Sequence, residues 1–394
     1  MLPDWLRRGA GPGRFFVVPD GPAAAGDVLE ELAAAGELAD WPLFLGWVVG
    51  QPTWMSNIGH GKALSVLGGY ASVDAIASGA IRYLPVRLSQ VPRLLSERIA
   101  PEVVVVRARP ERHGFRLSGS VGWSLTAVKR ARRIVVEVDD SGPKIDTPEL
   151  PSRDVLALPS KTAPYSPPRP MLDDVDRRIG ELVVGLIPDR ATIQHGPGNI
   201  SEAVLSAIDR PVKVWSGIVS DALIQLSERG LLVGQAIAAY LWGGPELHEL
   251  AAQGLVRLRG VEETHDAGAL AAIDRFVTVN TALEVGLDGS VNIERVGNRM
   301  VAGIGGHADF CAAGSTSPGG LSIVALRASR KGHSTIVPIV ERTSTARSSI
   351  DVVVTEHGVA DLRGLDDAAR SRALLLVCEP ALRAGLERAV VAMK

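Results

Sequence analysis

The fold is decided by the run Arg14-Phe-Phe-Val-Val-Pro-Asp-Gly-Pro and by the Ala/Leu/Glu-rich residues 23–38 that follow it. A short apolar run before a Pro/Gly turn predicts a buried strand, and the stretch after the turn predicts an amphipathic helix over residues 23–38. Two other short β-branched runs, Val103–Arg107 and Arg133–Val138, also have the composition of buried strands. Strands that alternate with helices indicate the α/β class with mostly parallel sheets covered on both faces.

The length and the prolines predict two domains. A chain of 394 residues is long enough for two domains of about 150–200 residues each. Between residues 151 and 170 the chain carries six prolines mixed with Ser, Lys and Thr. Proline removes a backbone donor and fixes φ, so this segment is expected to be an extended connector. We therefore predict an N-terminal domain over residues 1–160 and a C-terminal domain over residues 171–394, which opens with a helix over residues 172–186.

The composition excludes several classes of partner. The net charge is −2 and the pI is about 6.5, so neither nucleic acid nor an anionic membrane is expected as a partner. The two cysteines, Cys311 and Cys378, cannot form a disulfide framework and have no metal-type spacing. No signal-peptide pattern or run long enough to span a membrane is present. These observations predict a soluble, cytoplasmic protein.

A glycine turn joins a strand to a helix at the start of the second half. Its sequence is Ala191-Thr-Ile-Gln-His-Gly-Pro-Gly-Asn-Ile-Ser. Glycines let a phosphate approach the backbone, and a helix N-terminus offers free N–H groups. A dinucleotide fingerprint requires a third glycine where this chain has Ser201, so a nicotinamide site is disfavoured. A tight turn without a ligand and a phosphate or carboxylate contact both stay open.

A hairpin carries the first candidate for catalysis. Asp288-Gly289 lies between alternating apolar residues in Phe276-Val-Thr-Val-Asn-Thr-Ala-Leu-Glu-Val-Gly-Leu-Asp-Gly-Ser-Val-Asn, which is a strong hairpin signal. On a straight strand Glu284 projects to the face opposite Leu283 and Val285. Asn280, four residues earlier, shares that face and is a candidate to bind substrate. From spacing alone, a solvated surface glutamate is the favoured interpretation.

Two glycine-containing segments follow this hairpin. Gly303-Ile-Gly-Gly-His-Ala-Asp is expected to be a loop whose amides line a site, with His307 and Asp309 able to orient a substrate. No third ligand lies at a metal-type spacing, so no metal is expected there. Further on, Asp351-Val-Val-Val-Thr predicts a buried parallel strand that ends at Thr355. The residues after it, Glu356-His-Gly358, would lie at its carboxyl end, where open α/β sheets bind ligands.

Taken in order, these stretches resemble the acetyl-CoA hydrolase/transferase family, which includes 4-hydroxybutyrate and succinyl-CoA:acetate CoA-transferases. The motifs that carry the resemblance are Asn280-Thr-Ala-Leu-Glu-Val, Gly303-Ile-Gly-Gly-His-Ala-Asp-Phe, Gly319-Gly-Leu-Ser-Ile-Val-Ala-Leu and Val353-Val-Thr-Glu-His-Gly-Val-Ala-Asp-Leu-Arg-Gly. Looser matches extend through Ile193-Gln-His-Gly-Pro-Gly into the N-terminal half. The chain departs from the family pattern at Gly286, where Asp is usual, and at His307, where Gln or Ser is common.

The resemblance implies two similar open α/β domains with the active site in the cleft between them. It also implies that Glu284 is the nucleophile of a CoA-transferase, which forms a glutamyl-CoA thioester in a ping-pong reaction between an acyl-CoA and a small carboxylic acid. Coenzyme A is then a substrate, and no metal or tightly bound cofactor is needed. The residues expected to bind substrate or CoA, or to stabilise the oxyanion, are Asn280, Gly305, Gly306, His307, Glu356 and Gly358.

Two other functions stay open at this point. A thioesterase would use the same glutamate and let water complete the reaction. A diverged acyl-CoA-binding or biosynthetic variant would not need Glu284 at all. The sequence names neither the acyl donor nor the acceptor, and assembly into a homo-oligomer is left open.

Overall fold

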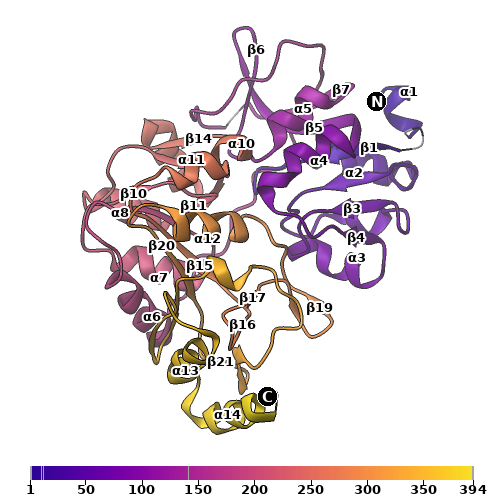
Figure 1. The fold of residues 1–394 in the computed structure, drawn as a ribbon. Coiled ribbons are helices and arrows are strands. Elements are labelled where there is room, and N and C mark those ends of the chain that lie inside the picture. Colours follow the sequence, from indigo (N-terminus) through magenta and orange to yellow (C-terminus); the bar gives the residue numbers. More distant parts are fainter. Residues whose placement is uncertain (1, 10, 12, 141, 393–394) are drawn as a thin grey trace. The chain divides into compact units, whose positions relative to one another are not determined.

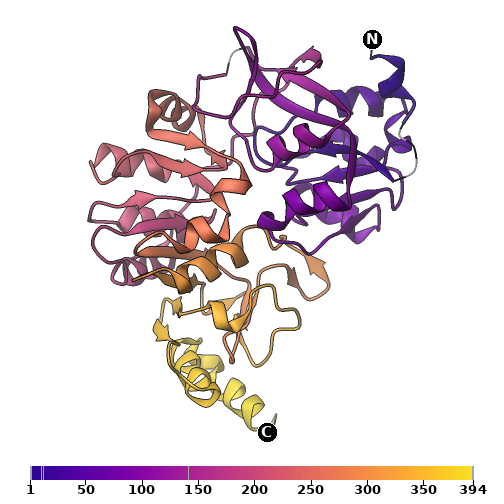
Figure 2. The same cartoon turned by 45° about the horizontal axis from the view of Figure 1, so that its top comes forward.

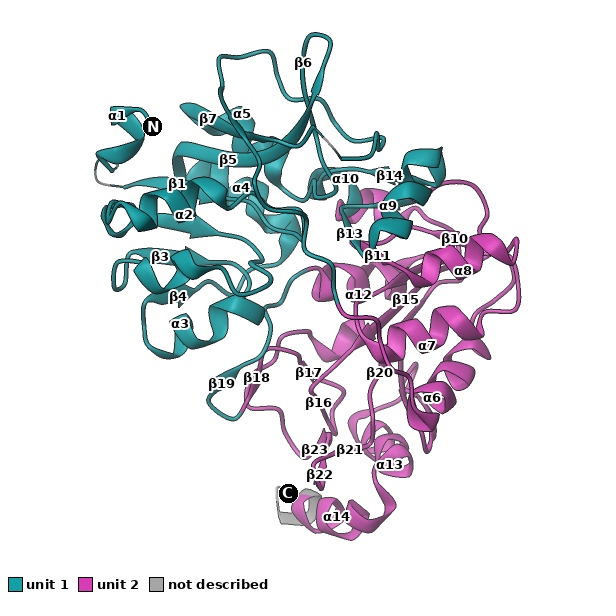
Figure 3. Cartoon of the chain, turned by 180° about the vertical axis from the view of Figure 1, so that it is seen from behind, with its two compact units in different colours: residues 1–167, 237–264, 297–305 teal, residues 168–236, 265–296, 306–394 magenta. Residues whose placement is uncertain are grey.

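The computed structural model describes residues 2–9, 11, 13–140 and 142–392. The chain divides into two compact units (Figure 3). Unit 1 has residues 1–167, 237–264 and 297–305, and unit 2 has residues 168–236, 265–296 and 306–394. The predicted domains, 1–160 and 171–394, are each one continuous stretch. In the structure the later segments 237–264 and 297–305 also belong to unit 1.

Unit 1 is built on a mostly parallel sheet (Figure 1). Every pairing along its main path is parallel, and one further strand, β6, pairs antiparallel with β5. The strands in spatial order are β4 (Ile81–Tyr83), β3 (Ala63–Ser65), β2 (Leu43–Leu45), β1 (Arg14–Val18), β5 (Ala100–Glu111), β7 (Arg133–Val138) and β8 (Leu156–Pro159), with β6 (Gly114–Leu117) beside β5. The helices of this unit are α1 (Asp4–Arg7), α2 (Asp27–Ala34), α3 (Val73–Ala77), α4 (Val91–Glu97), α5 (Ser124–Arg130), α9 (Pro245–Leu250) and α10 (Val261–Thr264).

The strand predictions in unit 1 are confirmed, but two other expectations were wrong. The helix predicted over residues 23–38 is the shorter α2, because the N-cap Gly26 has non-helical angles and Gly36 has a positive φ of 73°. The Pro-rich connector contains the short strand β8, which pairs with β7 through Leu156–Pro159. Proline at the end of an edge strand costs no ladder bond, so the proline signal hid this strand.

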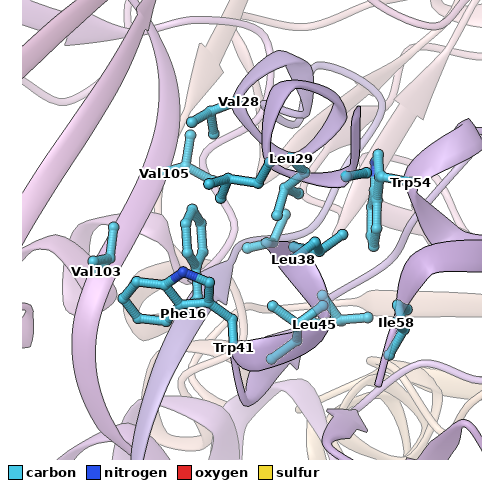
Figure 4. Packing of buried hydrophobic residues seen from close by; sticks show 14 of the residues in the cluster. Phe16, Val28, Leu29, Leu38, Trp41, Leu45, Trp54, Ile58, Val103 and Val105 are labelled. Atoms are coloured by element: carbon cyan, nitrogen blue, oxygen red, sulfur yellow. The ribbon is translucent and has the colours of Figure 1, made fainter. Parts of the chain in front are cut away.

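The core of unit 1 lies between α2 and the sheet (Figure 4). Val28, Leu29 and Leu32 of α2 are buried at helical spacing against Phe16 of β1 and residues of β2 and β5. Phe16 and Trp41 meet edge to face, with ring centroids 5.3 Å apart. This packing fixes α2, and therefore the loop between β1 and α2, on the sheet.

Unit 2 has a second mostly parallel sheet. Its order is β10 (Lys213–Val214), β9 (Thr192–His195), β15 (Phe276–Thr281), β20 (Leu321–Ala325), β24 (Val352–Thr355) and β25 (Gly358–Asp361), of which β25 alone on this path runs antiparallel to its neighbour. The helices of this unit are α6 (Asp174–Val184), α7 (Asn199–Ala207), α8 (Ala222–Glu228), α11 (Ala267–Ala271), α12 (His307–Thr316), α13 (Asp367–Val377) and α14 (Arg383–Ala392). Helices α13 and α14 form the yellow end of the ribbon (Figure 2).

Short elements complete the chain. The strands are β11 (Ile218–Ser220), β12 (Ala236–Ala238), β13 (Tyr240–Trp242), β14 (Val256–Leu258), β16 (Glu284–Gly286), β17 (Val291–Asn292), β18 (Arg295–Val296), β19 (Arg299–Met300), β21 (Ser329–Arg330), β22 (His333–Ser334) and β23 (Ile336–Val337). Of these, β17, β16 and β23 form a small separate sheet in unit 2. None of the helices in the described part of the chain has both the length and the apolar character needed to cross a membrane. The predicted α/β class with mostly parallel sheets is confirmed.

Candidate active site

The predicted motifs of the second half gather at one edge of the unit 2 sheet. Strands β9, β15, β20 and β24 are mutually parallel, so their carboxyl ends lie at the same edge. The Gly196–Gly198 turn follows β9, Glu284 follows β15, and Glu356–Gly358 follows β24. Open α/β sheets bind ligands outside the carboxyl ends of their strands. This edge is therefore the candidate active site.

The strand order changes direction at β9. The chain passes from β9 through α7 to β10 on one side, whereas β15 lies on the other side. Such switch points leave a crevice between two carboxyl ends. Here the amides of Gln194 and Asn280 exchange two hydrogen bonds between β9 and β15, of 3.2 and 3.1 Å. Asn280 is buried, and its side chain joins the two strands.

The straight strand expected from Asn280 to Glu284 was wrong. Strand β15 ends at Thr281, and the chain leaves the main sheet before β16 begins at Glu284. The two residues therefore belong to different sheets and do not share a face. The predicted hairpin itself is confirmed, since β16 pairs antiparallel with β17 and Gly289 has a φ of 93° in the turn.

Glu284 is half-buried, and its carboxylate is held from the neighbouring strand. Asn292, its direct partner in the hairpin, donates from Nδ2 to Oε2 of Glu284 over 2.7 Å. Asn292 is itself fixed, because it also donates to the carbonyl of Arg295 and accepts from the N–H groups of Glu294 and Arg295. A two-residue loop at Asp288-Gly289 would have paired Glu284 with Ile293. The loop has one residue more, so sequence reasoning missed Asn292.

His307 does not lie in a loop as expected. It is the first residue of α12, with Asp309 in the same turn, and it is buried. Its Nδ1 lies 2.8 Å from Oγ1 of Thr345, whose N–H donates to the carbonyl of Val291 in the hairpin. His307 thus connects the start of α12 to the hairpin that carries Glu284.

Burial keeps three histidines and one cysteine of unit 2 electrically neutral. It lowers the pKa of His307 and of His195 to about 4, and that of His265 to about 3. Burial also raises the pKa of the Cys311 thiol to about 12, and its Sγ lies 3.5 Å from Nδ1 of His307. A thiol that does not ionise near neutral pH is not a nucleophile. We therefore assign these buried histidines and Cys311 a structural role.

Two glycines lie against the ring of His265. A Cβ at Gly306, the N-cap of α12, would lie 2.5 Å from His265 Nε2, and one at Gly217 would lie 3.2 Å from the same atom. Gly217 follows β10, on the same edge of the sheet, and sequence reasoning missed it. A side chain at either position would clash with this ring, so the close packing of His265 requires glycine at both.

The remaining predicted residues, Glu356, Gly358 and Gly305, make other contacts. Oε2 of Glu356 accepts from the N–H of Ala328, and Gly358 begins β25 with a φ of 147°. No hydrogen bond or ion pair among the described residues joins either of them to Glu284. Gly305 belongs to unit 1, where its carbonyl accepts from the N–H of Leu88 over 2.9 Å.

One group of side chains could hold a metal ion. Ligand atoms of Glu356, His357 and Glu379 lie within 4.8 Å of one another. His357 Nε2 and Glu379 Oε2 are 3.5 Å apart, and Ser329 donates to the same carboxylate. These side chains thus already contact one another without an ion. Glu379 follows α13, so the spacing of the sequence could not have predicted the group.

Comparison with known proteins agrees with this geometry. Residues 245–390 match the acetyl-CoA hydrolase/transferase C-terminal domain. The chain is 28% identical over 350 residues to the 4-hydroxybutyrate coenzyme A transferase of Clostridium kluyveri. This alignment covers 83% of this chain and 81% of that protein. It is also 28% identical over 385 residues to a succinyl-CoA:acetate/propanoyl-CoA:succinate CoA transferase of Fasciola hepatica, over 92% and 80% of the two chains. The chain is thus similar to CoA-transferases over most of its length, and its residues 245–390 match the C-terminal domain of the acetyl-CoA hydrolase/transferase family.

A likeness of fold to a solved structure extends over the whole chain. RipA from Yersinia pestis superposes with a TM-score of 0.88 over 100% of this chain and 97% of its own, at 22% identity. A sequence identity this low shows a shared fold and nothing about function. The predicted resemblance to the acetyl-CoA hydrolase/transferase family and the predicted CoA-transferase class of enzyme are confirmed. The role of each predicted site residue stays a prediction.

Proposed function

We propose that the chain moves coenzyme A from an acyl-CoA to a carboxylic acid, with Glu284 as the residue that carries the thioester. The observation that supports it is the fixed carboxylate of Glu284 beside the carboxyl edge of a parallel sheet. Orientation of a reacting group can contribute roughly 7–11 kcal/mol to lowering a barrier. Asn292 supplies that orientation without neutralising the nucleophile.

The reaction proceeds by exchange at one carboxyl carbon. An oxygen of Glu284 attacks the thioester carbonyl, the C–S bond breaks, and a mixed anhydride and CoA thiolate result. The thiolate then attacks the glutamyl carbonyl, and the acyl group leaves as a carboxylate. An acceptor carboxylate reverses both steps and takes the coenzyme A. The free energy of the thioester is kept, so no nucleotide is consumed.

Amides at the start of α12 are the candidates to stabilise the tetrahedral intermediates. The first N–H groups of a helix have no partner within the helix, and the helix dipole adds partial positive charge there. His307 holds this end of α12 to the hairpin through Thr345. One oxyanion donor contributes about 3 kcal/mol.

The experiment is trapping of the intermediate. The protein is incubated with several acyl-CoAs, reduced with borohydride, digested and analysed by mass spectrometry. The modification is expected on the peptide that contains Glu284 and is expected to vanish in Glu284→Gln. The matched control is Glu341→Gln, which changes an exposed glutamate of the same unit. Transfer activity at wild-type level in Glu284→Gln would refute the role of this residue.

Hydrolysis is the second candidate, because the matched family includes hydrolases. Thiol release from acyl-CoA is measured with and without added acetate or succinate. Release that depends on the acceptor supports transfer, whereas release at the same rate without it supports hydrolysis. A protein that binds acyl-CoA with neither activity would be a binding variant.

A further inference from the structure

A group of possible metal ligands lies at the turn between β24 and β25. Thr355 pairs with Gly358, so Glu356 and His357 are the two residues of this hairpin loop. Glu379 follows α13, and one ligand atom from each of Glu356, His357 and Glu379 lies within 4.8 Å of the others. The acyl transfer proposed above uses none of these three side chains, so their arrangement needs a separate explanation.

A buried contact holds the two parts of this group together. The hydroxyl of Thr355 donates to the carbonyl of Val377, the last residue of α13, over 2.6 Å, and it accepts from the N–H of His357 over 3.2 Å. Both Thr355 and Val377 are buried. The fold itself therefore places the chain after α13 beside the hairpin loop. An ion would find Glu379 next to His357 without a rearrangement of the backbone, which lowers the cost of binding.

Hydrogen bonds from outside the group orient both carboxylates. The N–H of Ala328 donates to Oε2 of Glu356 over 2.8 Å, and the hydroxyl of Ser329 donates to Oε2 of Glu379 over 3.2 Å. These donors lie at the start of β21, which runs beside α13 in Figures 1 and 3. Carboxylates that bind metal ions are commonly held by outer hydrogen bonds of this kind.

The group carries two negative charges and no permanent positive charge. Oxygens of Glu356 and Glu379 lie within 4.8 Å of each other, and no ion pair in the described part of the chain joins either glutamate to an arginine or a lysine. His357 is the ion-pair partner of Glu379, but a histidine is charged only when it is protonated. Two carboxylates that share a site repel each other. A divalent cation would neutralise both and would also accept the lone pair of a neutral imidazole.

The distances and the exposure suit a small metal ion. Bonds from Zn²⁺ to histidine nitrogen and carboxylate oxygen measure about 2.0–2.2 Å, which places two ligands of a tetrahedral ion about 3.4 Å apart. Nε2 of His357 and Oε2 of Glu379 are 3.5 Å apart. The side chains of His357 and Glu379 are 31% and 28% exposed, so an ion can enter from solvent and water can complete its coordination.

We propose that Glu356, His357 and Glu379 bind a divalent transition-metal ion of the Zn²⁺ type. One imidazole with two carboxylates matches the ligands that ions of this class accept. The ion joins the β24–β25 loop to the chain after α13, and a ligand that binds only the folded state stabilises it. It takes no part in the reaction at Glu284.

The test is a titration of the whole protein after removal of metal with a chelator. Co²⁺ is the spectroscopic probe, and Zn²⁺ is the competitor. Saturable binding of about one equivalent of Co²⁺ is expected, with visible absorption bands that vanish on addition of Zn²⁺, because Zn²⁺ binds such sites more tightly than Co²⁺. Zn²⁺ is also expected to raise the melting temperature. No saturable binding of either ion would overturn the proposal.

Two variants with matched controls assign the site. Glu379→Gln and His357→Gln are each expected to weaken Co²⁺ binding at least about tenfold, the loss that even an outer partner of a metal ligand causes. Glu341→Gln changes an exposed glutamate of the same unit, and His113→Gln changes an exposed histidine at the same position of another two-residue hairpin loop, between β5 and β6. Both controls are expected to bind Co²⁺ as the wild type does. Wild-type affinity in His357→Gln or Glu379→Gln, or an equal loss in the controls, would contradict the assignment.

Discussion

Asp20 makes the stability of unit 1 depend on pH. It follows β1, is 1% exposed, and accepts a 2.8 Å hydrogen bond from the hydroxyl of Tyr240. Burial raises the pKa of Asp20 from 3.8 to about 7. Between these values the folded state binds a proton that the unfolded state has released. Stability therefore falls as pH rises from about 4 to 7, and the loss is complete above the folded pKa.

The magnitude follows from the size of the shift. About three pH units at 1.36 kcal/mol each correspond to roughly 4 kcal/mol of unfolding free energy. Asp20→Asn keeps an acceptor for Tyr240 but cannot ionise. We expect the wild type to lose stability relative to Asp20→Asn over this range, so that the variant is the more stable protein at pH 8.

The assay is urea denaturation followed by tryptophan fluorescence at several pH values. Six of the seven tryptophans lie in unit 1, so the signal reports mainly on that unit. The difference between the two proteins cancels other titrating groups, including Glu137, whose pKa burial also raises to about 7. Identical pH dependence in wild type and Asp20→Asn would refute the reasoning.

Three further predictions concern unit 2. Burial lowers the pKa values of His195, His265 and His307, so the unfolded state binds more protons than the folded state between about pH 4 and 6.5. Unit 2 should therefore lose stability as the pH falls through this range. Hydrogen exchange of peptides from unit 2 measures the loss. Gly306→Ala places a Cβ 2.5 Å from His265 and should lower the melting temperature. Gly185→Ala, where the backbone angles are helical and a Cβ makes only ordinary contacts of 3.4 Å or more, should raise it slightly; calorimetry compares the two variants. His307→Leu leaves a buried threonine hydroxyl unpaired and should cost about 1–3 kcal/mol in denaturant unfolding, which His307→Gln should largely restore.

Local patterns predicted the elements that depend on local physics. The strands β1, β5, β7, β9 and β24 were found because buried parallel strands are short, continuous apolar runs. The hairpin was found because Asp288-Gly289 can adopt the backbone angles that a turn needs. The carboxyl edge could be predicted as well, since parallel strands must present their ends together.

The contacts that define the site could not be predicted in the same way. A single apolar run from Phe276 to Leu287 gives no sign that the chain changes sheets near Ala282. The pairing of Asn292 with Glu284 depends on one extra residue in the turn, and a shift of one residue reverses every side chain of a strand. The contact of Thr345 with His307 joins residues 38 positions apart, through packing that no local pattern encodes.

The break between β15 and β16 determines what Glu284 can do. A glutamate within β15 would have lain in the main sheet among buried neighbours, where an uncompensated charge is costly. After the break the same residue lies in a small sheet beside the carboxyl edge, half-exposed and fixed by Asn292. Gly217 and Gly306, at the same edge, leave the space that the ring of His265 fills. If Glu284→Gln kept full transfer activity, the reacting carboxylate would have to be sought along that edge, because Cys311 and the buried histidines are neutral there.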